Sequence, residues 1–173
     1  MNHLIISCSL SPKSRSAVLA EHLTEAINAS ADSAELVDLR KLELPFCDAG
    51  ACYGHPNVSK LKEQITAAAS VTIGVPIYNY DVGGATRNLI ALTGDVWTNK
   101  VVGFVCAAGG QGSHMAVMGL ANSLMLDFRC MIVPRFVYTT GQAFTEAELT
   151  DEEVKKRIAE LATELRRVSK ALS

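Results

Sequence analysis

The segment from Ser9 to Ser16 gathers groups that bind phosphate. Four hydroxyls and a cation stand where a stretch of helical periodicity begins, and they belong to Ser9, Ser11, Ser14, Arg15 and Ser16. A helix N-terminus adds unpaired N–H groups and the positive end of the helix dipole. The Gly-x-x-x-x-Gly-Lys and Gly-x-Gly-x-x-Gly patterns are both absent, which leaves a monophosphate as the ligand. An ordinary serine-rich turn with a helix cap explains this segment, taken alone, equally well.

A second segment, from Pro76 to Gly84, suits a flat ring. Tyr78 and Tyr80 flank Asn79, and a glycine pair follows. Aromatic faces stack on planar ligands, an amide can hydrogen-bond the edge of a ring, and glycines let the backbone approach closely. The alternative is that the two tyrosines only cover the end of a sheet.

A third segment, from Ala107 to His114, offers bare backbone amides in the run Gly109-Gly110-Gln111-Gly112. Such amides can point at a carbonyl-bearing heterocycle and stabilise negative charge that develops on its reduced form. A glycine-rich turn by itself is weak evidence for a binding site. The evidence is stronger because three such segments occur in one chain. A surface or capping role is favoured for His114 over a hydrogen bond to a substrate.

Apolar, β-branched runs alternate with helical segments, as in repeated βα units around a parallel sheet. The predicted strands span residues 4–8, 35–39, 71–75, 101–107 and 130–137. The third is predicted to end at Pro76, and Pro134 inside the last places that strand at a sheet edge. Ligands bind beyond the carboxyl ends of parallel strands, so the segments after the first, third and fourth strands are expected to meet at one edge.

Helical periodicity fills the gaps between the strands. One helix is predicted to follow Ser16 as its N-cap, and another follows Pro56-Asn57. A third helix, over 118–128, is rich in apolar side chains on more than one face. Core packing is favoured for it over a subunit contact.

The last helix is the clearest element. Thr150 and Glu153 suggest a capping box, and apolar residues from Val154 to Leu172 form one stripe. Basic and acidic residues alternate on the rest of its surface. This pattern indicates a solvated face and not a nucleic-acid surface.

The overall composition bounds the class of protein. A chain of 173 residues fits one domain, and 49% of its residues are hydrophobic. The net charge of −2 provides no excess of positive charge that would attract nucleic acid or anionic membranes. The first apolar run, Leu4-Ile5-Ile6, has no basic leader and is too short for a membrane span, so a cytoplasmic location is expected.

Five scattered cysteines do not predict a disulfide framework. Cys47, Cys52 and His55 are the one group that could bind metal or act in redox chemistry. Their C-x4-C spacing is not that of a zinc knuckle, and a fourth ligand is missing locally. A structural or incidental role is favoured, and no metal site is predicted.

Three motifs together resemble those of the NADPH-dependent FMN reductases. They are the run Ser9 to Ser16, the string Pro76-Ile77-Tyr78-Asn79-Tyr80 followed by Gly84-Ala85-x-Arg87-Asn88-Leu89, and Ala108-Gly109-Gly110-Gln111-Gly112. They occur in the family's order from Leu4 to about Val137. The resemblance implies one flavodoxin-like domain over 1–173, an α/β three-layer sandwich with a five-stranded parallel sheet of order 2-1-3-4-5.

The resemblance also implies a set of FMN-binding residues. The phosphate would be held by Ser9, Ser11, Ser14, Arg15 and Ser16, and the ring by Pro76, Ile77, Tyr78, Asn79 and Tyr80. The far edge of the ring would meet Gly109, Gly110, Gln111 and Gly112. No catalytic side chain is predicted, since hydride transfer belongs to the flavin.

The implied activity passes electrons from NADPH or NADH through FMN to a quinone, an azo compound, a metal ion or free flavin, in a homodimer or homotetramer. The alternative is an electron carrier of the flavodoxin type without nicotinamide oxidation. Its usual strong acidity is missing here. A phospho-signalling domain is disfavoured, because strand one ends in Ser7-Cys8 without a carboxylate.

The sequence departs from the family pattern in places. Cys8 stands where a glycine is common, Arg87 replaces a common lysine, and Thr93 to Trp97 replaces an Asp-Trp pair. These changes leave the FMN site intact as a prediction. They weaken any inference about the electron acceptor.

Overall fold

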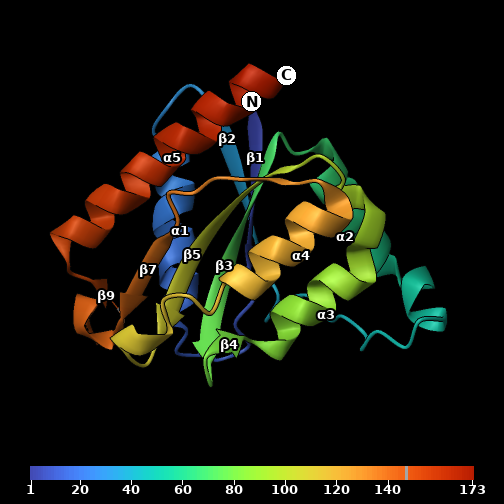
Figure 1. The fold of residues 1–173 in the computed structure, drawn as a ribbon, viewed down its shortest axis with the longest axis horizontal. Helices are drawn as coiled ribbons and strands as arrows, with labels where there is room; N and C mark the ends of the chain where they lie inside the picture. The colour runs from blue at the N-terminus through green and yellow to red at the C-terminus, as the bar shows by residue number, and fades with distance from the viewer. Residues whose placement is uncertain (147) are drawn as a thin grey trace.

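A mostly parallel sheet lies between two layers of helices (Figure 1). The computed structural model describes residues 1–146 and 148–173. The strands of the sheet are β1 (Asn2–Ser7), β2 (Ser33–Asp38), β3 (Ser70–Tyr78), β4 (Asp81–Val82), β5 (Val101–Ala108), β6 (Met131–Ile132) and β7 (Val137–Thr140). Two further short strands, β8 (Phe144–Thr145) and β9 (Glu148–Leu149), pair with each other outside this sheet.

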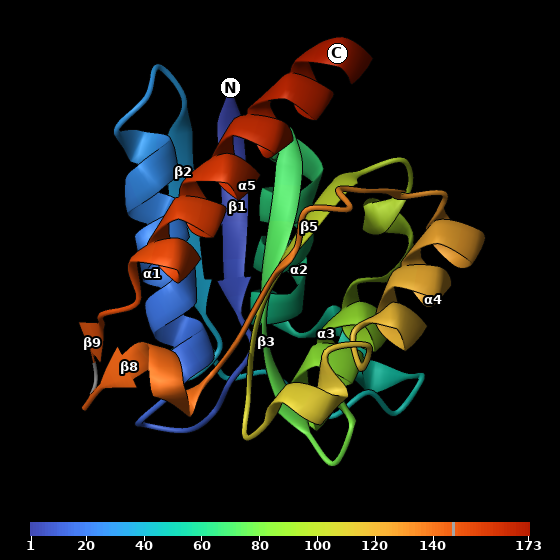
Figure 2. The same ribbon diagram turned by 60° about the vertical axis from the view of Figure 1, so that its left-hand side comes forward.

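The helices divide between the two faces of the sheet. They are α1 (Arg15–Asn28), α2 (Pro56–Ala67), α3 (Gly84–Thr93), α4 (Met118–Phe128) and α5 (Glu152–Leu172), with short 3₁₀ turns η1 (Ala51–Gly54), η2 (Gly94–Trp97), η3 (Gln111–Ser113) and η4 (Gly141–Ala143). Helices α1 and α5 pack together on one face, and α2, α3 and α4 cover the other (Figures 1 and 2). Within the described residues, no helix is both long and apolar enough to span a membrane.

Alternating side chains of the strands build these two layers. In β1, Ile5 packs into the core beneath α1 and α5, whereas Leu4 and Ile6 pack into the core beneath α2, α3 and α4. All three side chains are buried. Strands buried on both faces appear in sequence as continuous apolar runs, which is why such runs identified them.

The strand order is β2-β1-β3-β5, and both β6 and β7 lie beside β5. The predicted order 2-1-3-4-5 is confirmed, with β5 as the fourth predicted strand and β6 and β7 in the place of the fifth. Strand β3 runs parallel to both β1 and β5. The carboxyl ends of these three strands therefore meet at one edge of the sheet.

Strand β3 does not end at Pro76 as predicted but continues to Tyr78. The Cys8 N–H donates to the Gly74 carbonyl, so backbone groups at 74 and 76 face the β1 side. Proline has no N–H to donate to a neighbouring strand. Strand β1 ends at Ser7, so it has no carbonyl opposite Pro76 that would lack a donor. A proline is therefore tolerated in this central strand, just past the end of its neighbour.

The predicted last strand, 130–137, is two short strands instead. Strands β6 and β7 pair with opposite ends of β5, and the residues between them leave the ladder. Pro134 lies in this gap because it has no N–H to donate and a fixed φ. The edge position is confirmed, because both strands have β5 on one side and no described strand on the other.

The predicted N-cap of the first helix is displaced by two residues. Helix α1 begins at Arg15, and the Ala17 N–H donates to Ser14 Oγ over 3.0 Å. Ser16 is instead a buried residue of the first turn. Ser14 takes the cap because its backbone is extended, as a cap requires, while Ser16 is already helical.

The predicted capping box of the last helix is wrong. The N-cap of α5 is Asp151, whose Oδ1 accepts from the N–H groups of Glu153 and Val154 at 2.9 and 3.1 Å. A carboxylate satisfies two first-turn donors and suits the positive end of the helix dipole. Thr150 lies just outside the helix.

Helix α4 buries one side and exposes the other. Leu120, Ala121 and Leu124 are buried against the sheet, so core packing is confirmed for this side. On the outer side, Met125 is 37% exposed and Leu126 is 84% exposed. The apolar surplus noticed in the sequence therefore lies on the surface of this chain.

Candidate functional site

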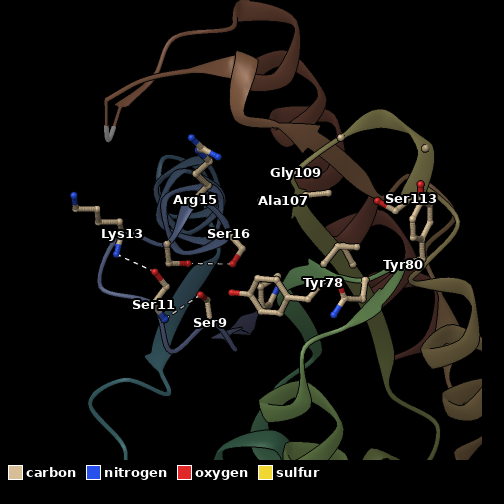
Figure 3. Close-up of a pocket in the computed structure, with 17 residues that line it drawn as sticks. Ser9, Ser11, Lys13, Arg15, Ser16, Tyr78, Tyr80, Ala107, Gly109 and Ser113 are labelled. Carbon is tan, nitrogen blue, oxygen red and sulfur yellow. Dashed lines mark hydrogen bonds between the residues drawn. The ribbon is translucent and has the colours of Figure 1, made fainter.

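A cavity of about 730 Å³ opens at the carboxyl ends of β1, β3 and β5 (Figure 3). Three loops far apart in the sequence enclose it. Its lining residues are Ser9, Ser11, Lys13, Ser14, Arg15, Ser16, Pro76, Ile77, Tyr78, Asn79, Tyr80, Ala107, Ala108, Gly109, Gly110, Gly112 and Ser113. Two cations are among them, and no Asp or Glu of the described chain is. The cavity therefore favours an anionic ligand.

The loop after β1 presents ordered hydroxyls at one end of the cavity. Ser9, Ser14 and Ser16 are buried residues, and the oxygens of Ser14 and Ser16 lie 3.2 Å apart. The Ser11 N–H donates to Ser9 Oγ over 3.3 Å, which fixes the turn. Helix α1 begins at this end of the cavity, and the first N–H groups of a helix have no hydrogen-bond partner within the helix. Hydroxyls and amide donors thus converge where a phosphate would be bound.

Arg15 is held in place by the segment after β7. Its guanidinium carbon lies 5.9 Å from the centre of the Phe144 ring, a cation–π distance. A Cβ built on Gly141 would lie only 2.8 Å from Arg15 Nη1. The missing side chain at Gly141 therefore makes room for the guanidinium.

The β3–β4 connection is a two-residue hairpin turn with an unusual backbone. Tyr78 pairs with Asp81, and between them Asn79 and Tyr80 have φ values of 51° and 61°. Consecutive positive φ angles are those of a type I′ turn, a conformation that asparagine adopts at lower cost than tyrosine. This turn directs both residues to the cavity at a cost in backbone strain.

The two tyrosines form different parts of the cavity wall. Tyr78 extends toward the serines of the first loop, whereas Tyr80 stands beside Ser113 (Figure 3). A Cβ on Gly112 would meet the Tyr80 hydroxyl at 3.3 Å. Tyr80 therefore links the second loop to the third.

The loop after β5 borders open space. A Cβ built on Gly109 or Gly110 would meet no atom within 4 Å. Tyr138 of β7 supports the loop from behind, because its hydroxyl donates to the Gly110 carbonyl and lies 3.1 Å from Ser113 Oγ. The backbone of this loop is thus fixed and accessible to a ligand.

Residues 1–145 match the family described as NADPH-dependent FMN reductase. The chain belongs to this family. It is therefore an oxidoreductase that uses flavin and NAD(P)H. The resemblance seen in three sequence motifs is confirmed.

Individual relatives agree with this family. The NAD(P)H-dependent FAD/FMN reductase of Geobacillus thermodenitrificans (strain NG80-2) is 31% identical over 134 residues, 76% of this chain and 72% of the relative. FerB of Paracoccus denitrificans, a flavoenzyme NAD(P)H:(acceptor) oxidoreductase, shares the fold with a TM-score of 0.79 at 19% identity, over 98% of this chain and 97% of FerB. An archaeal flavodoxin has a TM-score of 0.65 at 11% identity, over 96% and 99% of the two chains. The flavodoxin-like fold is confirmed.

The residues of this FMN reductase family member fit the ligand that the family name implies. One end of the cavity has hydroxyls, helix amides and cations for a phosphate. The other end has open backbone at Gly109 and Gly110 and the rings of Tyr78 and Tyr80 for a flat ring system. The volume lies within the range of about 300–1,000 Å³ that is usual for small-molecule sites.

The structure brings all but one of the predicted site residues to this cavity. The exception is Gln111, which lines an adjacent cavity with His114, Arg135 and Arg157. His114 stacks edge-on against Tyr138, with ring centres 6.4 Å apart.

The sequence prediction did not include some residues that line or support the cavity. Lys13, Ala107, Ala108 and Ser113 line the cavity and lie within the quoted loops, so their position alone could have identified them. Tyr138 supports the third loop but follows the predicted last strand. No local pattern in the sequence marks it.

Two departures from the family pattern have structural explanations. Burial raises the pKa of the Cys8 thiol to about 12, so Cys8 is neutral and does not act as a nucleophile. Arg87 donates to Asp81 Oδ1 over 3.1 Å, which secures the β3–β4 hairpin. The Val82 N–H and then this guanidinium hold the pKa of Asp81 below its usual range. Arg87 therefore supports the turn beside the cavity.

Cys47, Cys52 and His55 lie around η1, away from this cavity. His55 caps α2, with its Nδ1 accepting from the Asn57 N–H over 3.2 Å. Among the residues that the structure describes, no three His, Cys, Asp or Glu side chains are grouped to hold a metal ion.

Proposed function

We propose that this chain binds one FMN in the cavity at the carboxyl ends of β1, β3 and β5, with residues 1–173 acting as one FMN-binding domain. Bound there, FMN would take electrons from NAD(P)H and deliver them to a small-molecule acceptor. The observation that supports this is a single cavity with a cationic, hydroxyl-lined end and a glycine- and tyrosine-lined end. These two ends complement a phosphate and a flat ring.

At the phosphate end, the hydroxyls of Ser9, Ser11, Ser14 and Ser16 would donate hydrogen bonds to phosphate oxygens, together with first-turn amides of α1. Arg15 adds a charge-assisted hydrogen bond. No carboxylate of the described residues lines the cavity to compete with the phosphate. The anion thus fixes the ligand at its polar end.

At the ring end, the backbone of Gly109, Gly110 and Gly112 would hold one edge of the flat ring. Pro76, Ile77, Tyr78, Asn79 and Tyr80 form the opposing wall. Bound FMN supplies the hydride and electron transfer, so the chain provides no nucleophile or general base. Gln111 is left out of this assignment because its side chain lines the adjacent cavity.

The part of the cavity wall that Tyr78 and Tyr80 form, here called the tyrosine wall, also suits a second flat molecule. Tyr78 is 53% exposed and Tyr80 is 74% exposed. Exposed aromatic faces stack on a nicotinamide or on an aromatic acceptor. Donor and acceptor would therefore bind in turn at the same wall, and the acceptor would be a quinone, an azo compound, a metal ion or free flavin.

Spectroscopy of the purified full chain tests this proposal. We expect a flavin absorbance band, its bleaching by NADPH or NADH without oxygen, and its return when a quinone is added. We also expect continuous NAD(P)H oxidation in the presence of quinone. A chain that stays colourless and whose melting temperature does not respond to FMN would contradict the proposal. Flavin binding without NAD(P)H oxidation would indicate an electron carrier instead.

We further propose that the chain acts as a homodimer or homotetramer through the exposed side of α4. Met125 and Leu126 of α4 expose apolar side chains, as do Met115 before the helix and Met131 after it. Burying such side chains in a second copy is favourable by about 25 cal/mol per Å². Leu126→Lys is expected to lower the mass measured by light scattering to that of a monomer, whereas Leu172→Lys, on the exposed end of α5, should not. An unmodified chain that is monomeric would overturn this proposal.

A further inference from the structure

Two of the five cysteines lie together in the loop between β2 and α2. Cys47 precedes η1, and Cys52 belongs to it. Cys47 is half-buried, whereas the other four cysteines are buried. It also packs against the small apolar cluster that contains Cys52. Reagents in solution can therefore reach one sulfur of a close pair.

The backbone around this pair is fixed by side-chain hydrogen bonds. The Cys47 N–H donates to Asn88 Oδ1 over 2.9 Å, on α3. Asp48 Oδ1 accepts from the Gly50 N–H at 2.9 Å and from the Cys52 N–H at 3.2 Å. Ala49 between them has a φ of 58°, which turns the chain back on itself. These hydrogen bonds fix the turn that joins the two cysteines, and Cys47 packs against the apolar cluster to which Cys52 belongs.

The surroundings of the two sulfurs differ. Cys47 Sγ lies 3.7 Å from the Tyr53 hydroxyl. Hydrogen bonds from the Ala49 N–H, the Tyr53 hydroxyl and the Cys52 thiol lower the pKa of Cys47. Desolvation raises the pKa of Cys52, and neighbouring Asp48 adds to this. Cys47 therefore forms the nucleophilic thiolate more readily than Cys52 does.

A disulfide needs the sulfurs to approach to about 2.05 Å, so the loop must have room to adjust. A cavity of about 480 Å³ borders Cys52 and is also lined by Asp48 and His55. The loop is exposed at Asp48, Ala49 and Gly50. The cavity and the exposed turn leave room for the backbone between the two cysteines to adjust.

We propose that Cys47 and Cys52 form a dithiol that hydrogen peroxide oxidises reversibly to a disulfide. The Cys47 thiolate attacks one peroxide oxygen, the O–O bond breaks, and the leaving hydroxide takes a proton to become water. Cys52 sulfur then attacks the Cys47 sulfenic acid. The S–S bond forms, and the sulfenic hydroxyl leaves as a second water with the Cys52 proton. The two thiols lose two electrons, and the peroxide gains them.

Mass spectrometry of the reduced full chain after peroxide treatment tests this proposal. We expect the loss of two hydrogen atoms, a peptide map that links Cys47 to Cys52, and full reversal by dithiothreitol. We also expect iodoacetamide to label Cys47 at least about tenfold faster than any other cysteine. A wild-type chain that shows no cross-link would overturn the proposal.

Variants separate the roles of the two sulfurs. Cys52→Ser should stop the reaction at a sulfenic acid on Cys47 that dimedone traps, and Cys52→Ala should do the same without a buried hydroxyl. Cys47→Ser should show neither product, and Cys130→Ala is the matched control that keeps the cross-link. Loss of two hydrogens that persists in Cys47→Ser would contradict the assignment. Because the readout is mass, the outcome is independent of whether FMN binds.

Discussion

At the scale of single residues, Gly141 sets the place of the Arg15 guanidinium. In Gly141→Ala the new methyl carbon would lie 2.8 Å from Arg15 Nη1, so the arginine must move. We expect the Kd for FMN to rise about three- to tenfold, equivalent to about 1 kcal/mol of lost charge-assisted hydrogen bonding. The melting temperature should hardly change, because the far end of a flexible side chain moves at little cost. Flavin fluorescence titration measures the Kd.

Two further variants provide comparisons for Gly141→Ala. Arg15→Ala should show the largest loss of FMN affinity that this interaction can cause. Gly54→Ala is the matched control, because its Cβ would meet no atom within 4 Å. If Gly141→Ala binds FMN as tightly as the unmodified chain, Arg15 does not hold the phosphate from its present position.

Tyr80 combines backbone strain with a place in the cavity wall. Its φ of 61° costs a tyrosine about 1–2 kcal/mol, part of which a glycine would recover. We expect Tyr80→Gly to raise the melting temperature by about 2 °C. It should also lower kcat/KM for NAD(P)H about fivefold, because about 1 kcal/mol of aromatic stacking is lost. Calorimetry and steady-state kinetics measure the two effects.

Tyr80→Ala tests the same residue without relieving the strain. It should lower kcat/KM by a similar factor and should not raise the melting temperature. A Tyr80→Gly variant that is less stable than Tyr80→Ala would show that the turn is not strained at this position.

At the scale of elements, the start of α5 depends on Asp151. Removing its carboxylate in Asp151→Ala leaves the N–H groups of Glu153 and Val154 without this acceptor. We expect a loss of about 1 kcal/mol in the free energy of unfolding, or about 2–4 °C in melting temperature. Thermal unfolding followed by circular dichroism measures the loss.

Thr150→Ala is the natural comparison, since the sequence favoured Thr150 as the cap. Its hydroxyl lies 3.4 Å from the Ala143 carbonyl and makes no bond to the helix amides. We expect a smaller loss than in Asp151→Ala. The reverse order would mean that the helix begins one residue earlier.

These elements show what local pattern could predict. Apolar runs placed β1, β3 and β5, because strands buried on both faces need such runs. The half-exposed β2 gave a weaker run, β6 and β7 were predicted as one strand, and the two-residue β4 was not predicted. Pro76 and Pro134 have the same local chemistry and different outcomes. Pro76 stays in its strand because β1 ends beside it, whereas Pro134 interrupts pairing along β5. The difference lies in the neighbouring strand, which the local sequence does not contain.

Some features of the candidate site could likewise be predicted from the sequence, and others could not. The three loops were predicted to meet because their positions follow from strand order, and the structure places them around one cavity. The sequence did not predict that the Gln111 side chain lines the adjacent cavity or that Tyr138 supports the third loop, because the direction of a side chain depends on the conformation of the turn and on β7 behind it. Sequence spacing predicts which loops meet but not which side chains turn inward.

At the scale of the whole molecule, Asp32 connects the elements at the end that lies opposite the cavity. Its carboxylate accepts from the Met1 amino group and from Arg166 Nε, each at 2.7 Å, and lies 3.4 Å from His3 Nε2. These hydrogen bonds hold the pKa of Asp32 well below its ordinary range. Burial lowers the pKa of His3, although Asp32 opposes this. The chain start, β1 and α5 therefore depend on one charge cluster.

Both pKa shifts predict that acid weakens the fold. Because the pKa of His3 is lower in the folded chain than in the unfolded chain, the unfolded chain binds this proton first as the pH falls below about 6.5, and stability present above this pH is lost. Asp32 adds its own loss only in stronger acid. We expect the melting temperature to fall between about pH 7 and about pH 5, and His3→Asn to reduce that slope, because asparagine cannot take up the proton but can still hydrogen-bond Ser70. His22→Asn, on the half-exposed side of α1, should keep the full slope. An unchanged slope in His3→Asn would show that the acid sensitivity arises elsewhere in the molecule.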